Sequence, residues 1–92
     1  MELRHEPDRH RFVAVLPGGE AVLEYTEHGR TLDYRHTYTP PALRGQGIAK
    51  ELVLFALDYA RSQGLRVIPT CPYVASVIRN NPTYSDLVAD PA

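Results

Sequence analysis

The segment PPALRGQGIAKEL, residues 40–52, separates two sequence patterns and carries two glycines where a helix should begin. The two prolines cannot donate hydrogen bonds to a sheet, so they end any strand that reaches them. Gly45 and Gly47 lack a Cβ, and an anion can therefore approach the unpaired N–H groups of the first helical turn. Arg44 adds a side chain suited to phosphate. The segment predicts a diphosphate-binding loop; the alternative is that its glycines only permit a tight strand-to-helix turn.

The residues before this segment alternate between apolar and polar side chains, which is the pattern of half-buried strands. The predicted strands, joined by glycine-containing turns, are Phe12 to Leu16, Glu20 to Glu27 and Thr31 to Thr39. Alternation in the third strand predicts that four side chains share one face, Leu32, Tyr34, His36 and Tyr38, opposite Asp33, Arg35 and Thr37. Residues 1–10 are polar and are expected to be loose.

The residues after the segment have a helical period instead. The predicted elements are a helix from about Gly45 to Gln63, a short buried strand from Leu65 to Thr70 and a second short helix from Val74 to Arg79. The stretch from Tyr84 to Val88 is expected to form a short strand or turn. The predicted order is β-β-β-α-β-α, an α+β fold with a mixed, mainly antiparallel sheet in a single domain, residues 1–92.

Composition excludes several classes of protein. The net charge of −1 argues against a nucleic-acid-binding surface, which needs clustered excess Lys and Arg. Cys71 is the only cysteine, so an internal disulfide and a multi-cysteine metal site are excluded. No metal site is expected from the His, Asp and Glu spacing either. The sequence has no signal-peptide pattern and no run of about 18 apolar residues, so we expect a soluble cytoplasmic protein without a membrane partner.

The glycine-containing loop also matches a family signature. RGQGIA, Arg44 to Ala49, fits the pattern Arg/Gln-x-x-Gly-x-Gly/Ala of the GNAT superfamily of N-acetyltransferases, and the chain resembles the small single-domain members of that superfamily. Further matching pieces are AVLEY at 21–25, HT at 36–37, PTCPYV at 69–74 and PTYSDLV at 82–88. Two departures are Tyr38-Thr39, where the subfamily has an acidic residue and valine, and Asn81-Pro82, where it has His-Pro.

The resemblance implies a minimal, truncated GNAT fold that binds acetyl-CoA. In that fold the strands ending near Thr39 and Thr70 splay apart, the pantetheine arm runs between them, and the loop amides bind the diphosphate. The residues expected to contact the cofactor are Thr37, Tyr38, Thr39, Arg44, Gly45, Gln46, Gly47, Ile48, Ala49, Lys50, Cys71, Tyr73 and Asn81.

Two residues are candidates for catalysis. The Cys71 thiol could accept the acetyl group and pass it on, and the resemblance places the matching cysteine at the acetyl-CoA site; the alternative is a buried structural cysteine. His36 could act as a base, or it could be a core-facing histidine bonded to a carbonyl. The other three histidines, His5, His10 and His28, are expected to be solvated, and Tyr84 is expected to pack.

The function implied by the resemblance is acetyl-CoA-dependent N-acetyl transfer to an unknown amine or protein lysine, directly or through Cys71. The protein would act as a monomer or homodimer. The alternative is a non-catalytic CoA-binding or protein-interaction module, because the chain lacks the C-terminal strands of a full GNAT domain.

Overall fold

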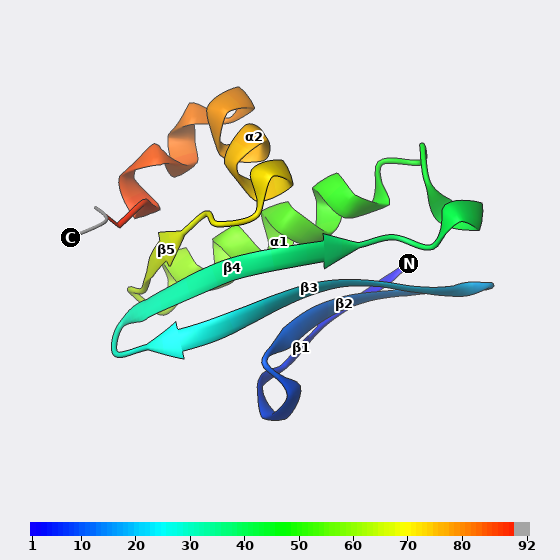
Figure 1. Cartoon of the computed structure of the whole chain (residues 1–92), viewed down its shortest axis with the longest axis horizontal. Coiled ribbons are helices and arrows are strands. Elements are labelled where there is room, and N and C mark those ends of the chain that lie inside the picture. Colours follow the sequence, from blue (N-terminus) through cyan, green and yellow to red (C-terminus); the bar gives the residue numbers. More distant parts are fainter. Residues whose placement is uncertain (90–92) are drawn as a thin grey trace.

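The computed structural model describes residues 1–89, which form one five-stranded sheet and two α-helices (Figure 1). The strands are β1 (Glu2–Glu6), β2 (Arg11–Leu16), β3 (Gly19–His28), β4 (Thr31–Tyr38) and β5 (Arg66–Ile68). The helices are α1 (Ile48–Ser62) and α2 (Pro72–Asn80), with short 3₁₀ segments η1 (Pro7–Arg9), η2 (Pro41–Leu43) and η3 (Pro82–Leu87).

The strands lie in the order β1-β2-β3-β4-β5, and the pairs β1–β2, β2–β3 and β3–β4 are antiparallel. The strands β4 and β5 pair in parallel over three residue pairs, Thr31–Arg66 to Asp33–Ile68. The predicted α+β class with a mixed, mainly antiparallel sheet is confirmed. Because β5 ends at Ile68 while β4 continues to Tyr38, the far end of β4 has no β5 partner.

The expectation of a loose N-terminus is wrong, because Glu2–Glu6 forms β1 and pairs with β2 along its whole length. The chain order is therefore β-β-β-β-α-β-α. The sequence ELRHE gave no strand signal, since charged side chains occupy three of its five positions. Such charges are typical of edge strands, where they discourage pairing with other chains.

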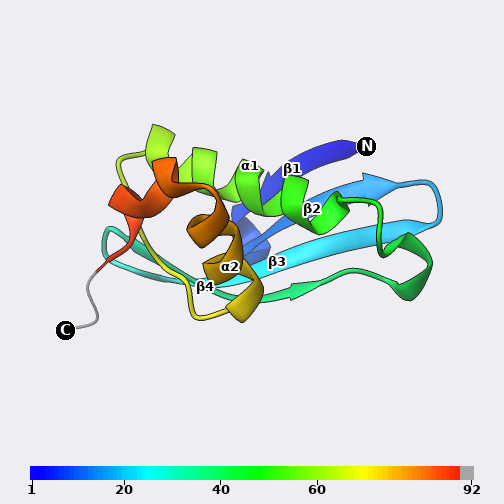
Figure 2. The ribbon, with the colours of Figure 1, turned by 90° about the horizontal axis from the view of Figure 1, so that it is seen from above.

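The core lies between the sheet and the two helices, which lie over the same face of the sheet (Figure 2). Apolar side chains of both helices join those of β2, β3 and β4 in one buried cluster. Tyr34 at its centre is fully buried, and its hydroxyl donates a 2.6 Å hydrogen bond to the Ala56 carbonyl oxygen of α1. Burial raises the pKa of Tyr34 strongly, so the phenol stays protonated and ties β4 to α1.

His5 was expected to be solvated, but it is partly buried and packs against this core. Its ring stacks on Phe12 with centroids 4.4 Å apart, and its Nε2 and the Tyr25 hydroxyl form a 2.6 Å hydrogen bond. Burial lowers the pKa of His5, partly opposed by the charge of Glu27. Burial also raises the pKa of Tyr25 to about 12. These contacts fasten the edge strand β1 to the core.

A β-bulge in β4 reverses its side-chain alternation. Tyr25 lies opposite Tyr34, but the preceding residue, Glu24, lies opposite His36, so Arg35 is an extra residue in β4. Beyond the bulge, Thr37 lies opposite the buried Leu23 and faces the helices. The prediction that His36 and Tyr38 share a face with Leu32 and Tyr34 is wrong: both are exposed on the opposite face, which we call the open face.

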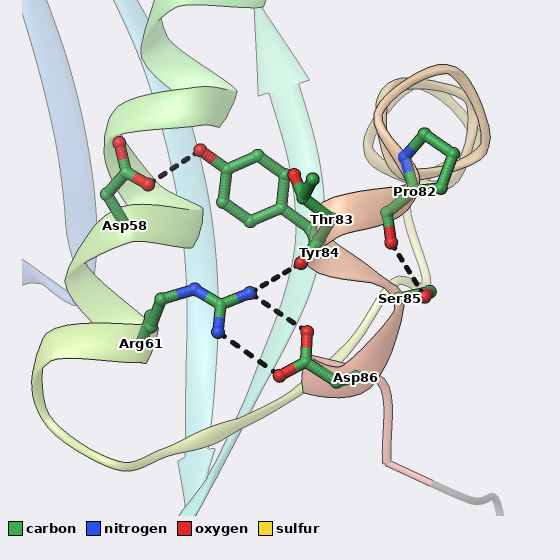
Figure 3. Close-up of polar contacts among 7 residues, drawn as sticks. All are labelled: Asp58, Arg61, Pro82, Thr83, Tyr84, Ser85 and Asp86. Atoms are coloured by element: carbon green, nitrogen blue, oxygen red, sulfur yellow. Dashed lines mark hydrogen bonds and ion pairs between the residues drawn. The ribbon is translucent and has the colours of Figure 1, made fainter.

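The segment after α2 is anchored to the second half of α1, as Figure 3 shows. The Arg61 guanidinium donates to both carboxylate oxygens of Asp86 at 3.1 and 2.9 Å and to the Thr83 carbonyl at 2.6 Å. The Tyr84 hydroxyl donates to Asp58 at 2.6 Å, and this bond raises the pKa of Tyr84. Tyr84 thus packs against α1, as expected, within a 3₁₀ segment.

Several element boundaries differ from those predicted. The first α-helix begins at Ile48 rather than Gly45, and the second begins at Pro72 rather than Val74. The stretch expected as a short strand or turn is mostly η3, and Val88 after it forms one parallel bridge with Val67. Proline is well suited to the first turn of a helix, because it lacks the N–H that has no partner there.

Candidate active site

A pocket of about 260 Å³ opens where β4 ends and α1 begins. The residues that line it are Thr39, Leu43, Arg44, Gly45, Gly47, Ile48, Ala49 and Tyr73. All except Leu43 are among the predicted cofactor contacts. Leu43 was missed because an apolar residue in a short 3₁₀ turn carries no signal of binding. The pocket therefore joins the glycine loop to the start of α2.

The two loop glycines have the backbone conformation that glycine alone adopts easily. Their φ angles are +79° at Gly45 and +77° at Gly47, in the left-handed region. The first hydrogen bond of α1 runs from Glu51 N to Gly47 O at 3.1 Å, and no side chain caps the turn before it. The amides of residues 48–50 therefore have no partner within the helix. No atom lies within 4 Å of where a Cβ would stand on either glycine, so the space above the loop is open.

The polar residues of the loop differ in their contribution to the pocket. Arg44 donates from Nε to the Thr39 carbonyl at 2.9 Å, which ties the loop to the end of β4. Its guanidinium makes no ion pair with a carboxylate among residues 1–89. Gln46 donates to the Ala42 carbonyl at 3.5 Å, and Lys50 is exposed on the first turn of α1 without lining the pocket. Arg44 is thus the cation best placed for an anion in the pocket.

Cys71 lies at the junction of β4 and α2. Its backbone N–H donates to the Tyr34 carbonyl at 2.9 Å, and its Sγ lies 3.7 Å from Thr37 Oγ1. Only 5% of the residue is exposed, and it belongs to the core cluster. The structure thus brings Cys71 and Thr37 together on the helix-covered side, whereas the imidazole of His36 lies on the open face.

Of the two remaining residues predicted to contact the cofactor, Tyr73 lines the pocket and Asn81 does not. Tyr73, in the first turn of α2, is 38% exposed, lines the pocket, and has its pKa raised by burial. Asn81 follows the last turn of α2, where its side-chain amide donates to the Val77 carbonyl at 2.8 Å. It does not line the pocket. The structure therefore assigns Asn81 to the end of a helix.

A buried carboxylate holds the point where β4 and β5 separate. Asp33 is 8% exposed; it accepts a hydrogen bond from the Thr70 hydroxyl and one of 3.0 Å from Arg35 Nη1. Sequence analysis missed this group because Asp33 falls in the polar half of an alternating strand. These bonds fix the connection between β5 and α2, and with it the position of Cys71.

Residues 1–89 contain neither a cluster of metal ligands nor a helix that could span a membrane. No group of three or more His, Cys, Asp or Glu side chains is arranged to hold a metal ion. The two α-helices within this part of the chain are too short and too polar to cross a membrane.

Comparisons with known proteins identify the family and the fold of the chain. Residues 11–87 match the model of the GCN5-related N-acetyltransferase family. The chain is similar to Protein NATD1 of Bos taurus, with 39% identity over 89% of this chain and 75% of the relative. The corresponding protein of Homo sapiens is 38% identical over the same shares of the two chains.

Among solved structures, a GCN5-like putative N-acetyltransferase from Staphylococcus aureus superposes with a TM-score of 0.74. The alignment covers 99% of this chain and 90% of that one at 20% identity, a likeness that establishes the fold. The sheet, the splayed strands and the glycine loop define a domain of the acetyltransferase type. The chain belongs to the GCN5-related N-acetyltransferase family.

Proposed function

We propose that this protein is an acetyl-CoA-dependent N-acetyltransferase. The observation that carries the proposal is the pocket at the first turn of α1, whose amides are uncapped and uncovered by side chains. Unpaired amides at a helix N-terminus attract phosphate groups. Family membership supports the acetyl-transfer class, and the pocket would hold the donor's diphosphate.

The amides of residues 48–50 would donate to the diphosphate oxygens, and Arg44 would add a charge-assisted contact from the rim. The second part of the donor site would be the edge of β4 beyond Tyr34, which β5 leaves unpaired. A free strand edge offers backbone groups that can pair with the amides of an extended pantetheine arm. The arm would then lead from the pocket at Thr39 toward Thr37 and Cys71.

We favour direct transfer to the acceptor amine over a route through Cys71. Bound acetyl-CoA supplies an activated acetyl thioester. A nucleophilic thiol must reach that carbonyl carbon, and Cys71 is 5% exposed within the core cluster. Packing of this kind is typical of a structural cysteine. The thiol and the Thr37 hydroxyl would form the wall of the acetyl site.

Acetyl-CoA should raise the thermal unfolding midpoint of the purified protein. At a hundredfold excess over Kd, binding to the native state stabilises it by about 2.7 kcal/mol. For a domain of this size that shift is about 10 °C or more. Pantetheine, which lacks the diphosphate, should give a much smaller shift at equal concentration. The proposal fails if saturating acetyl-CoA produces neither a shift nor heat in calorimetry.

The Cys71→Ala variant should retain acetyl transfer within about threefold of the wild-type rate, because the proposed route makes no bond to sulfur. The assay would follow release of free CoA thiol, with Cys71→Ser as the variant that keeps a polar atom at this position. A loss of about a hundredfold in both variants, with acetyl-CoA affinity unchanged, would instead establish the covalent route. Acetyl-CoA binding without transfer to any amine would indicate a non-catalytic CoA-binding module.

A further inference from the structure

The open face carries a carboxylate and an imidazole side by side at the bulge of β4. Glu24 on β3 lies directly opposite His36 on β4, and both side chains are exposed. Side chains of directly opposite residues on neighbouring strands are within contact distance, about 5 Å between Cβ atoms. Only the bulge at Arg35 places them together, because unbroken alternation would turn His36 toward the core.

Neighbouring arginines do not neutralise Glu24. Arg11, which lies opposite Glu24 on β2, pairs with Glu6 at 2.6 Å and with Glu20 at 4.0 Å. Arg35 pairs with Asp33 at 3.0 Å. Within residues 1–89, Glu24 forms no ion pair. A carboxylate surrounded by arginines with other partners is available to a cationic ligand.

The helix-covered side of the same part of β4 is closed. Thr37, the next residue after His36, lies against Cys71, which is nearly fully buried under the start of α2. An acceptor that approaches a thioester near Thr37 would therefore come from the open face. On that face it meets Glu24 and His36 beside the unpaired edge of β4.

We infer that the acceptor amine binds on the open face, with Glu24 as the residue that holds its ammonium form and His36 as the base. This inference rests on the proposed function. The ammonium group gives one proton to the His36 imidazole, and the neutral nitrogen attacks the thioester carbonyl carbon. The C–N bond forms, the C–S bond breaks, the second nitrogen proton passes to the CoA thiolate, and His36 releases its proton to water.

The test is an NMR titration of the ¹⁵N-labelled protein, saturated with CoA, using two alkylammonium probes: spermidine and Nα-acetyl-lysine methylamide. Both should shift the amide signals of Glu24 and His36. Glu24→Gln should weaken the affinity for both probes about fivefold, the upper range for an exposed charge pair. Added salt should weaken binding to the wild type but hardly to the variant. Tighter binding of spermidine would indicate a polyamine acceptor, and tighter binding of Nα-acetyl-lysine methylamide would indicate a protein lysine.

Glu27→Gln is the matched control, because Glu27 is an exposed carboxylate on the same strand that forms no ion pair within residues 1–89 and lies opposite Leu32, away from the bulge. It should leave the affinity of the probes unchanged. Shifts confined to other residues, no binding, or equal losses in both variants would overturn the inference. Signals of residues 45–49 that move on adding CoA would meanwhile show that the donor site is intact, so that failure of the proposed function is recognised separately.

The role of His36 is tested separately by the steady-state kinetics of the His36→Gln variant. The substitution should lower kcat for any alkylammonium acceptor that the wild type acetylates and should flatten the acidic limb of the pH–rate profile. The acetyl-CoA affinity should stay unchanged, because His36 does not line the donor pocket. An unaltered pH profile would remove His36 from the proposed reaction.

Discussion

Gly47→Val should reduce the affinity for acetyl-CoA by about a hundredfold or more, because several charge-assisted hydrogen bonds are lost together. A β-branched side chain at φ +77° is strained, and relief of that strain moves the amides of the first turn of α1. The added side chain would also stand in the open space above the loop. Isothermal titration calorimetry with acetyl-CoA measures the effect directly.

The strain itself costs stability, so a second glycine is needed as control. Gly29 in the β3–β4 turn has φ +61° and likewise has nothing within 4 Å of a Cβ. It lies at the opposite end of β4 from the pocket. Gly29→Val should therefore lose a comparable 1–2 kcal/mol or so of stability yet bind acetyl-CoA like the wild type. Equal affinity in both variants would mean that the loop does not bind the diphosphate.

Phe12→Ala should remove most of the stability of the fold. Phe12 is fully buried, and the rings of His5, Tyr25, Tyr34 and Tyr59 surround it with centroids 4.4 to 5.7 Å away. Replacing a buried Phe by Ala costs about 3–5 kcal/mol. Domains are stable by only about 5–15 kcal/mol in total, and small ones lie near the lower end. Urea denaturation, monitored by circular dichroism, measures the loss.

Phe55→Ala provides the comparison for that loss. Phe55 lies on α1 with its ring 6.1 Å from that of Phe12, but it is only partly buried. Less surface returns to water when it is truncated, so its cost should be less than half that of Phe12→Ala. Equal costs would show that the aromatic cluster is not centred on Phe12.

The local features of the fold could be predicted from the sequence, and the features that depend on neighbouring strands could not. The glycine loop, the long helix and the buried strand before Cys71 each have a signal within a few residues, and each is present. The strand β1 has no such signal, since its burial comes from pairing with β2. The environment of His5 was misjudged for the same reason, because Phe12 and Tyr25, which partly cover its ring, come from two other strands.

The residues of the candidate site likewise fall into those that could be predicted from the sequence and those that depend on strand pairing. The glycines and Arg44 at the rim of the pocket were predicted from the loop sequence, and Thr39 and Tyr73 from the family resemblance. The positions of Thr37 and His36 depend on a bulge that the alternation of β4 does not reveal. A bulge is defined by the register between two strands, so the sequence of one strand alone does not predict it. Asp33 was overlooked because its partner Thr70 lies 37 residues further along the chain.

The bulge at Arg35 makes this strand sensitive to the length of the chain as well as to its composition. Loss of Arg35 would restore simple alternation and leave positions 36–38 on their present faces, whereas pairing the same number of residues without the bulge would exchange those faces. A relative with a gap of one residue at the bulge would therefore keep the side chains of β4 on the same faces, and a relative with neither gap nor bulge would not. Relatives of equal overall identity could thus differ in which side of the sheet receives a substrate.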